Sequence, residues 1–286
     1  MRWKKARRSD NVVDARGRSG GLGGGRLSLA GVAIVVVIGL LSGQDPMQIL
    51  GQLADQSGQA PSQPNSTPAN GDDPQVAFVQ AILGDTEDTW RALFQQSGDQ
   101  YRDPTLVLFR GGVSSACGFA NSATGPFYCP GDRQVYLDLQ FFDEMASRFS
   151  VAGDFAQAYV IAHEVGHHVQ TLLGVSQQMQ AARQRGTRME GDNGLLVRQE
   201  LQADCFAGIW AYHAQQRHDW LEEGDLEEAL NAANAIGDDH LQQQSQGRVV
   251  PDAFTHGTSA QRVRWFRAGF ESGEPARCDT FQANRL

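Results

Sequence analysis

The stretch YVIAHEVGHHVQTLLG, from Tyr159 to Gly174, places three histidines and one glutamate within six residues of an otherwise apolar segment. Its apolar residues recur with helical spacing, so we expect a buried helix that is capped by Asp154 and ends at Gly174. Titratable groups are costly in such surroundings unless they hold a partner. The stretch therefore predicts a binding site on a helix.

His163, Glu164 and His167 form an H-E-x-x-H motif. Residues i and i+4 share one helix face, so both imidazoles can reach one ion, and Zn²⁺ suits neutral imidazole. Glu164 would then lie near a water on that ion and serve as the catalytic base. His168 points about 100° away from His167, and we assign it no metal role. The alternative is that these histidines are ordinary hydrogen-bonded residues.

A catalytic zinc site needs a third protein ligand. The downstream segment RQELQADCFAG places Glu200 and Asp204 four residues apart on an apolar face. We expect Glu200 to be the third ligand, and Asp204 to accept the second N–H of a ligand histidine. The alternative is a carboxylate pair that faces solvent. The other nearby carboxylates, in weaker contexts, are Asp154, Glu190 and Asp192.

Hydrolysis also needs a donor for the developing oxyanion. His256 is a candidate because it lies in a Gly/Thr/Ser turn before a helix, although a plain surface histidine is an equal alternative. Tyr136, Tyr212 and Arg262 are further candidates. The segment RQVYLDL (133–139) is either an edge strand that pairs with a peptide or an ordinary core strand.

Charge is distributed unevenly along the 286 residues. Residues 1–26 hold eight Lys/Arg against two Asp, a net charge of +6. Because the whole chain carries −9, the remaining residues carry −15. An acidic body argues against nucleic acid as a partner.

An uncharged run, Leu27–Gly43, follows the basic residues. As a helix its seventeen residues would span roughly 25 Å, the short end of a transmembrane segment. The positive-inside rule then predicts a cytoplasmic N-terminus and a domain on the periplasmic or extracytoplasmic side. A cleaved signal peptide and a buried core helix are the alternatives. We expect a basic tail (1–26), one membrane helix (27–43), a polar flexible linker (44–73) and one folded domain (74–286).

The four cysteines form an even set, as in disulfide-bonded exported proteins. We pair Cys117 with Cys129 because the residues between them indicate a hairpin, which leaves Cys205 with Cys278. The sequence permits three connectivities, and free buried thiols are the alternative.

Helical patterns cover most of the domain, and extended patterns are few. Extended segments are expected at 105–112 and in two short pieces within 125–139. A mostly helical α+β fold with a small sheet follows. The expected helices are 75–96, 141–149, 154–173, 193–217, 225–239 and 259–273.

Several separate motifs resemble a bacterial family of neutral zinc metallopeptidases. They are HEVGHHVQ (163–170), ELQAD (200–204), SSACGFANSATGPFYCPGDRQVYLDLQFF (114–142) and HGTSAQRVRWF (256–266). The resemblance covers residues 75–286 and the plan of tail, membrane span and stalk. The ELQAD element is also similar to the third-ligand helices of gluzincin peptidases. The resemblance implies a zincin-like fold with a strand beside the active-site helix that could pair with substrate.

Together these features predict a membrane-anchored zinc metallopeptidase that hydrolyses peptide bonds of a peptide or protein substrate. Two alternatives remain. One is a catalytically silent binding or scaffold protein of the envelope that holds zinc, and the other is a metal-dependent hydrolase of a non-peptide bond. A structural zinc usually has four protein ligands, whereas three ligands and a base are found here.

Overall fold

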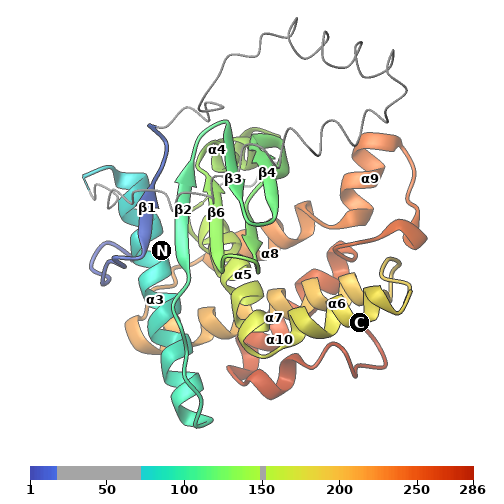
Figure 1. The fold of residues 1–286 in the computed structure, drawn as a ribbon. Helices are drawn as coiled ribbons and strands as arrows, with labels where there is room; N and C mark the ends of the chain where they lie inside the picture. The colour runs from blue at the N-terminus through green and yellow to red at the C-terminus, as the bar shows by residue number, and fades with distance from the viewer. Residues whose placement is uncertain (18–71, 149–152) are drawn as a thin grey trace, which may run out of the picture. The chain divides into compact units, whose positions relative to one another are not determined.

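A computed structural model describes residues 1–17, 72–148 and 153–286, all of which fall in one compact unit (Figure 1). The predicted membrane helix (27–43) and nearly all of the predicted linker lie outside the described residues. Among the described residues, no helix has both the length and the apolar character needed to cross a membrane.

The described chain is mostly helical with small sheets, which confirms the predicted α+β class. The helices are α3 (Pro74–Gln96), α4 (Gln140–Arg148), α5 (Asp154–Leu172), α6 (Val175–Gln184), α7 (Leu195–His218), α8 (Asp225–Ala235), α9 (Asp238–Gln246) and α10 (Ser259–Ser272), with short 3-10 turns η1 (Ser122–Thr124), η2 (Pro251–Ala253) and η3 (Pro275–Cys278).

Four strands form the main sheet in the order β1-β2-β6-β5. β1 (Val12–Asp14), β2 (Thr105–Phe109) and β6 (Gln134–Asp138) are parallel, and β5 (Phe127–Cys129) runs antiparallel to β6. A separate hairpin joins β3 (Gly112–Ser115) to β4 (Gly118–Asn121). β6 lies between two neighbours, so the RQVYLDL segment is a core strand, and β5 is the edge strand next to it.

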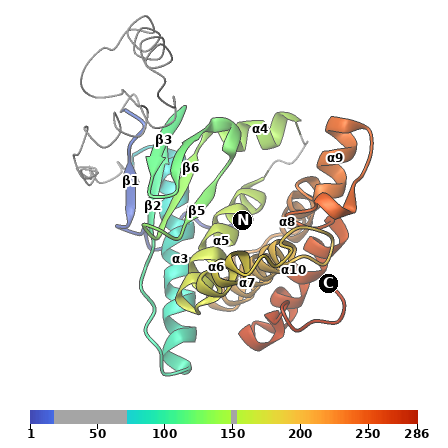
Figure 2. The ribbon, with the colours of Figure 1, turned by 45° about the vertical axis from the view of Figure 1, so that its right-hand side comes forward.

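Helix α5 is the central element of the fold. It contacts β5 and β6 and also α3, α7 and α8, and Figure 2 shows it between the sheet and α8. Tyr159, Phe155 and Ile161 of α5 are almost fully buried in the main core. A helix that is covered on nearly all sides holds its side chains in fixed positions, which suits a site that needs defined geometry.

The helices differ from the sequence prediction in several respects. Gly153 is the N-cap of α5, and Asp154 is its first residue, where its carboxylate accepts a hydrogen bond from Trp3 Nε1 at 2.8 Å. The predicted helix 225–239 divides into α8 and α9, because the backbone at Gly237 is extended. α6 was not predicted, since its sequence has few apolar residues.

Both predicted disulfides, Cys117–Cys129 and Cys205–Cys278, are present. The reason for the first pairing differs in part from the expected one. Cys117 lies in the turn of the β3–β4 hairpin, and Cys129 ends β5, so the bridge ties the hairpin to the edge of the main sheet rather than closing a single hairpin. The second bridge fastens α7 to η3.

Residues 1–17 are part of the folded domain and not a separate tail. β1 pairs with β2 over three residues, and the terminal ammonium of Met1 lies 2.9 Å from Glu222 Oε2. The positive-inside rule treats the charges here as a membrane-orientation signal. In the structure several of them face carboxylates of the domain, such as Arg7 opposite Glu87.

The crossing of α7 and α10 depends on two glycines. A Cβ atom at Gly269 would lie 1.9 Å from the carbonyl oxygen of Cys205, and one at Gly208 would lie 2.0 Å from the carbonyl oxygen of Phe266. Both distances are far below van der Waals contact, so the two backbones approach as closely as they do only because neither residue has a side chain.

We expect Gly269→Ala to destabilise the protein, although Gly→Ala inside a helix normally stabilises by about 1 kcal/mol. Overpacking at the crossing should cost about 1–3 kcal/mol and lower the melting temperature. Thermal unfolding of the full chain measures this, with Ala260→Ser on the exposed face of α10 as control. An unchanged or higher melting temperature would contradict the close approach.

Candidate metal centre

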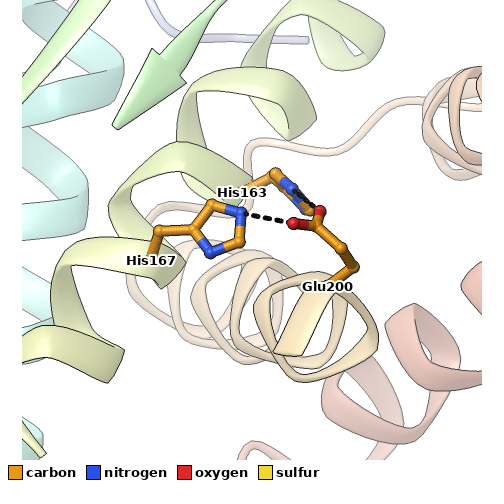
Figure 3. Close-up of side chains that lie close together, drawn as sticks. All are labelled: His163, His167 and Glu200. Carbon is orange, nitrogen blue, oxygen red and sulfur yellow. Dashed lines mark hydrogen bonds and ion pairs between the residues drawn. The ribbon is translucent and has the colours of Figure 1, made fainter. Parts of the chain in front are cut away.

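Two helices bring the candidate ligands together. His163 and His167 lie one turn apart on α5, and Glu200 lies on α7 (Figure 3). Their ligand atoms all lie within 4.8 Å of one another, and no other such group of three or more is found in the described chain. His163 Nε2 is 3.2 Å from Glu200 Oε2, and His167 Nε2 is 3.5 Å from Glu200 Oε1.

The spacing of α5 and α7 at this point is set by Gly166. A Cβ atom there would lie 3.0 Å from the carbonyl oxygen of Ala203 on α7. A glycine inside a helix normally costs about 1 kcal/mol of stability relative to alanine. The structure gives its reason, since close contact between the helices carries Glu200 within reach of both histidines.

Asp204 fixes the orientation of His163. Its Oδ1 lies 2.8 Å from His163 Nδ1 and also accepts hydrogen bonds from the Tyr159 hydroxyl at 2.6 Å and Arg262 Nη2 at 2.9 Å. Arg262 Nε donates to Oδ2 at 2.9 Å. Burial raises the pKa of Asp204, but Arg262 and His163 together lower it by a larger amount, so that the net pKa is about 2. The carboxylate is therefore ionised and can only accept, so His163 Nδ1 carries the proton.

Gln170 plays the same part for His167. Its Oε1 lies 2.9 Å from His167 Nδ1, while its Nε2 donates to the carbonyl oxygen of Gln199 and to Gln202 Oε1. Since the amide nitrogen is occupied as a donor, Oε1 must accept from His167 Nδ1–H. Both histidines therefore present an unprotonated Nε2 toward Glu200 when they are neutral. This is the tautomer that binds a metal through Nε2.

The electrostatics of the cluster follow from this arrangement. Burial raises the pKa of Glu200, but His167 and His163 lower it more, so the net value lies well below the usual range. Burial lowers the pKa of His163, but Asp204 and Glu200 raise it more, to about 10. The buried anion thus favours positive charge either on the two imidazoles or between them.

The three residues open onto a cavity of about 440 Å³ that Glu164 also lines. Glu164 is 8% exposed, and among the described residues no hydrogen bond or ion pair holds its carboxylate. Besides α5 and α7, the lining comes from β5, from α4, from Ile236 just after α8, from α9 and from the turn before α10. Apolar members of the lining are Phe127, Phe141, Val160, Ile236 and Leu241.

His256 also lines this cavity, and its side chain is half exposed. Asp238 holds the turn that carries it, because Oδ2 accepts the backbone N–H groups of Thr255, His256 and Gly257 at 2.6–3.0 Å. Asp238 Oδ1 lies 3.3 Å from His256 Nδ1, which leaves Nε2 as the ring nitrogen available to a substrate.

Other residues singled out in the sequence lie elsewhere. Tyr136 is buried in the sheet, where its ring stacks on Phe127 and its hydroxyl donates to Asp132 at 2.8 Å, so it does not line the cavity. Tyr212 packs against Gly273 at the end of α10. His168 Nε2 lies 2.6 Å from the carbonyl oxygen of Arg102, facing away from the centre.

Arg262 lines the cavity, but it is buried and engaged by Asp204. It acts as a supporting residue in the arrangement rather than a free oxyanion donor. The sequence analysis missed the supporting roles of Tyr159, Gln170 and Asp238. The signal for Gln170 was its position three residues after His167, which places both side chains on one helix face.

An H-E-x-x-H helix with a glutamate from a second helix, beside an open cavity, defines the class of HExxH metal centres, in which three protein ligands leave one position free. The chain belongs to the family described as "Putative neutral zinc metallopeptidase", whose profile matches residues 1–281.

Relatives extend over most of the chain. "Uncharacterized protein YpfJ" of Escherichia coli strain K12 is 51% identical over 288 residues, covering 98% of this chain and 99% of that protein. "Uncharacterized protein Rv2575" of Mycobacterium tuberculosis strain H37Rv is 44% identical over 219 residues, covering 73% of each. No solved structure shows significant similarity.

We expect Asp204→Asn to weaken zinc binding by about 10–100-fold, because the substitution removes the negative charge that strengthens the hydrogen bond to His163 Nδ1 and pairs with Arg262. Competition with a chromophoric chelator measures the affinity, and circular dichroism checks that the variant folds. Asp252→Asn, at an exposed carboxylate on η2, is the matched control. Unchanged affinity in a folded Asp204→Asn variant would argue against the assigned role.

Proposed function

We propose that this protein is a zinc-dependent peptidase whose metal is held by His163, His167 and Glu200. The observation that carries the proposal is the convergence of two Nε2 lone pairs on one buried carboxylate. The donor set of two imidazoles and one carboxylate suits zinc, and three protein ligands leave a position for water, as in catalytic zinc sites. The family assignment supports the same reading.

Bound zinc would supply a water with a pKa near 7 and would polarise the scissile carbonyl. Glu164 is the base in this proposal, because it follows the first ligand on α5 and its carboxylate faces the same cavity. It accepts the proton of the attacking water and returns it to the leaving amine. Asp204 and Gln170 keep the ligand imidazoles in the required tautomer throughout.

His256 is proposed to donate a hydrogen bond to the developing oxyanion through Nε2. The carboxylate of Asp238 orients the ring and favours the protonated form. Burial lowers the pKa of His256, but Asp238 and Glu200 raise it more, so the net value is raised. We do not assign the role of oxyanion donor to Tyr136, because its hydroxyl donates to Asp132 away from the cavity.

The substrate is proposed to be a peptide or protein with bulky apolar side chains next to the scissile bond. The cavity wall carries aromatic and aliphatic groups on both sides, and β5 is an edge strand along it. An extended peptide that pairs with β5 would present alternate side chains to that wall. In this proposal β5 is the edge strand that pairs with the peptide, in place of the RQVYLDL segment (133–139).

We expect Glu164→Gln to retain zinc and to lose hydrolytic activity by about 10²–10⁴-fold, since it removes the proton acceptor but no ligand. His163→Ala, by contrast, should lose the metal. Elemental analysis and digestion of a peptide library measure the two properties, with Glu190→Gln at an exposed position as control. Full activity of Glu164→Gln would refute its role, and a zinc-loaded wild type that cleaves no peptide would favour the scaffold or non-peptide alternatives.

We expect His256→Ala to lower kcat by about 10²–10³-fold with little change in KM or zinc content, because the interaction is made with the transition state. His240→Ala, on the exposed face of α9, is the matched control. A fall in zinc content, or a change confined to KM, would show that His256 acts otherwise.

A further inference from the structure

The most informative feature outside the metal centre is the way residues 1–17 dock on the domain. Val12, Val13 and Asp14 pair in parallel with Leu106, Val107 and Leu108, which extends the main sheet by one strand. Val12 is 1% exposed and belongs to the main hydrophobic core. The N-terminal segment therefore completes the sheet rather than covering its surface.

Glu87 of α3 depends on this docking. Its side chain is 1% exposed, and its carboxylate accepts hydrogen bonds from Ser9 Oγ at 2.5 Å, Asn11 Nδ2 at 2.8 Å and Arg7 Nη2 at 2.7 Å. All three donors come from the N-terminal segment. Without that segment the carboxylate would lose all three of these hydrogen bonds, so the side chain of Glu87 is matched to the docked N-terminal segment.

Gly84 of α3 is shaped to receive the same segment. A Cβ atom there would lie 2.9 Å from the carbonyl oxygen of Arg7 and 3.2 Å from the amide nitrogen of Ser9. A glycine in the middle of a 23-residue helix is otherwise unfavourable, so the close approach of the N-terminal backbone accounts for it.

An ion pair joins the two ends of the segment 18–71. Arg16 Nη1 donates to Asp73 Oδ2 at 2.8 Å, just before α3 begins. The hydrocarbon core of a bilayer is about 30 Å thick. A single crossing between Arg16 and Asp73 would place them on opposite faces of that core, which is incompatible with this contact.

The basic charge of the N-terminus has a second explanation in these contacts. Arg7 faces Glu87 and Asp88, and Arg2 lies 3.0 Å from Asp219 Oδ2. The net positive segment thus meets the acidic body of the same chain. Part of the Lys/Arg excess before Leu27 is thus balanced by carboxylates of the same chain.

We propose that the N-terminal segment and the metal-centre domain lie on the same side of any membrane with which the chain associates, because Arg16 and Asp73 are in direct contact. A return crossing would need a second run of about 20 apolar residues, whereas 18–71 contains one such run of seventeen. This arrangement replaces the cytoplasmic tail and external domain expected from the positive-inside rule. It does not depend on zinc chemistry.

The direct test introduces single cysteines at exposed positions of the full chain, Lys5→Cys in the N-terminal segment and Arg248→Cys in the domain. Spheroplasts are treated with a membrane-impermeant maleimide before and after permeabilisation, and the chain without an introduced cysteine gives the background. Equal behaviour of the two sites, both labelled from outside or both protected, is expected. Labelling of one site with protection of the other overturns the proposal.

A second test keeps the membrane intact and disturbs the docking itself. Gly84→Val should speed tryptic cleavage within residues 1–17 of membrane-bound protein at least several-fold, while the 72–286 fragment stays resistant. Ala92→Val, at an exposed position of α3, is the control for valine in the helix. If the wild type is cleaved there as fast as Gly84→Val, the segment is not docked in the membrane-bound chain, and the proposal fails.

Discussion

The buried carboxylate of Asp204 is the interaction on which the rest of the site depends. It joins three helices, because it accepts from Tyr159 and His163 of α5 and from Arg262 of α10 while its own backbone belongs to α7. A buried charge survives only when its hydrogen bonds are satisfied. Arg262 of α10 therefore supports His163 indirectly, because it helps to lower the pKa of the carboxylate that accepts from His163 Nδ1.

Much of the site could be predicted from sequence because its spacing is local. Residues four apart on a helix share a face whatever the tertiary structure, so His163 with His167 and Glu200 with Asp204 could be grouped in advance. The position of the Tyr136 hydroxyl could not be judged from sequence, because its partner, Asp132, is brought into reach by a turn. The RQVYLDL strand was ambiguous because edge and centre differ only in neighbours supplied by distant segments.

The N-terminal strand could not be predicted for a related reason. β1 has three residues and gains its stability from pairing with β2, which lies about ninety residues later in sequence. The basic residues near β1 match the positive-inside rule for membrane proteins. That rule counts charges and takes no account of carboxylates elsewhere in the chain that could pair with them. The α+β fold class was easier to predict, because that prediction needs only the proportion of helical and extended patterns in the sequence.

The difference between Glu200 and Asp204 shows why one is a candidate ligand and the other a support. Asp204 has both oxygens occupied by Arg262, and its Oδ1 also by Tyr159 and His163. Its charge is already balanced by the guanidinium. Among the described residues, Glu200 has ion pairs only with the Nε2 atoms of His163 and His167, so its charge is balanced chiefly by protons on those rings or by a cation between them. With both Nδ1 atoms already acting as donors, a divalent ion satisfies all three groups at once and leaves the imidazoles neutral.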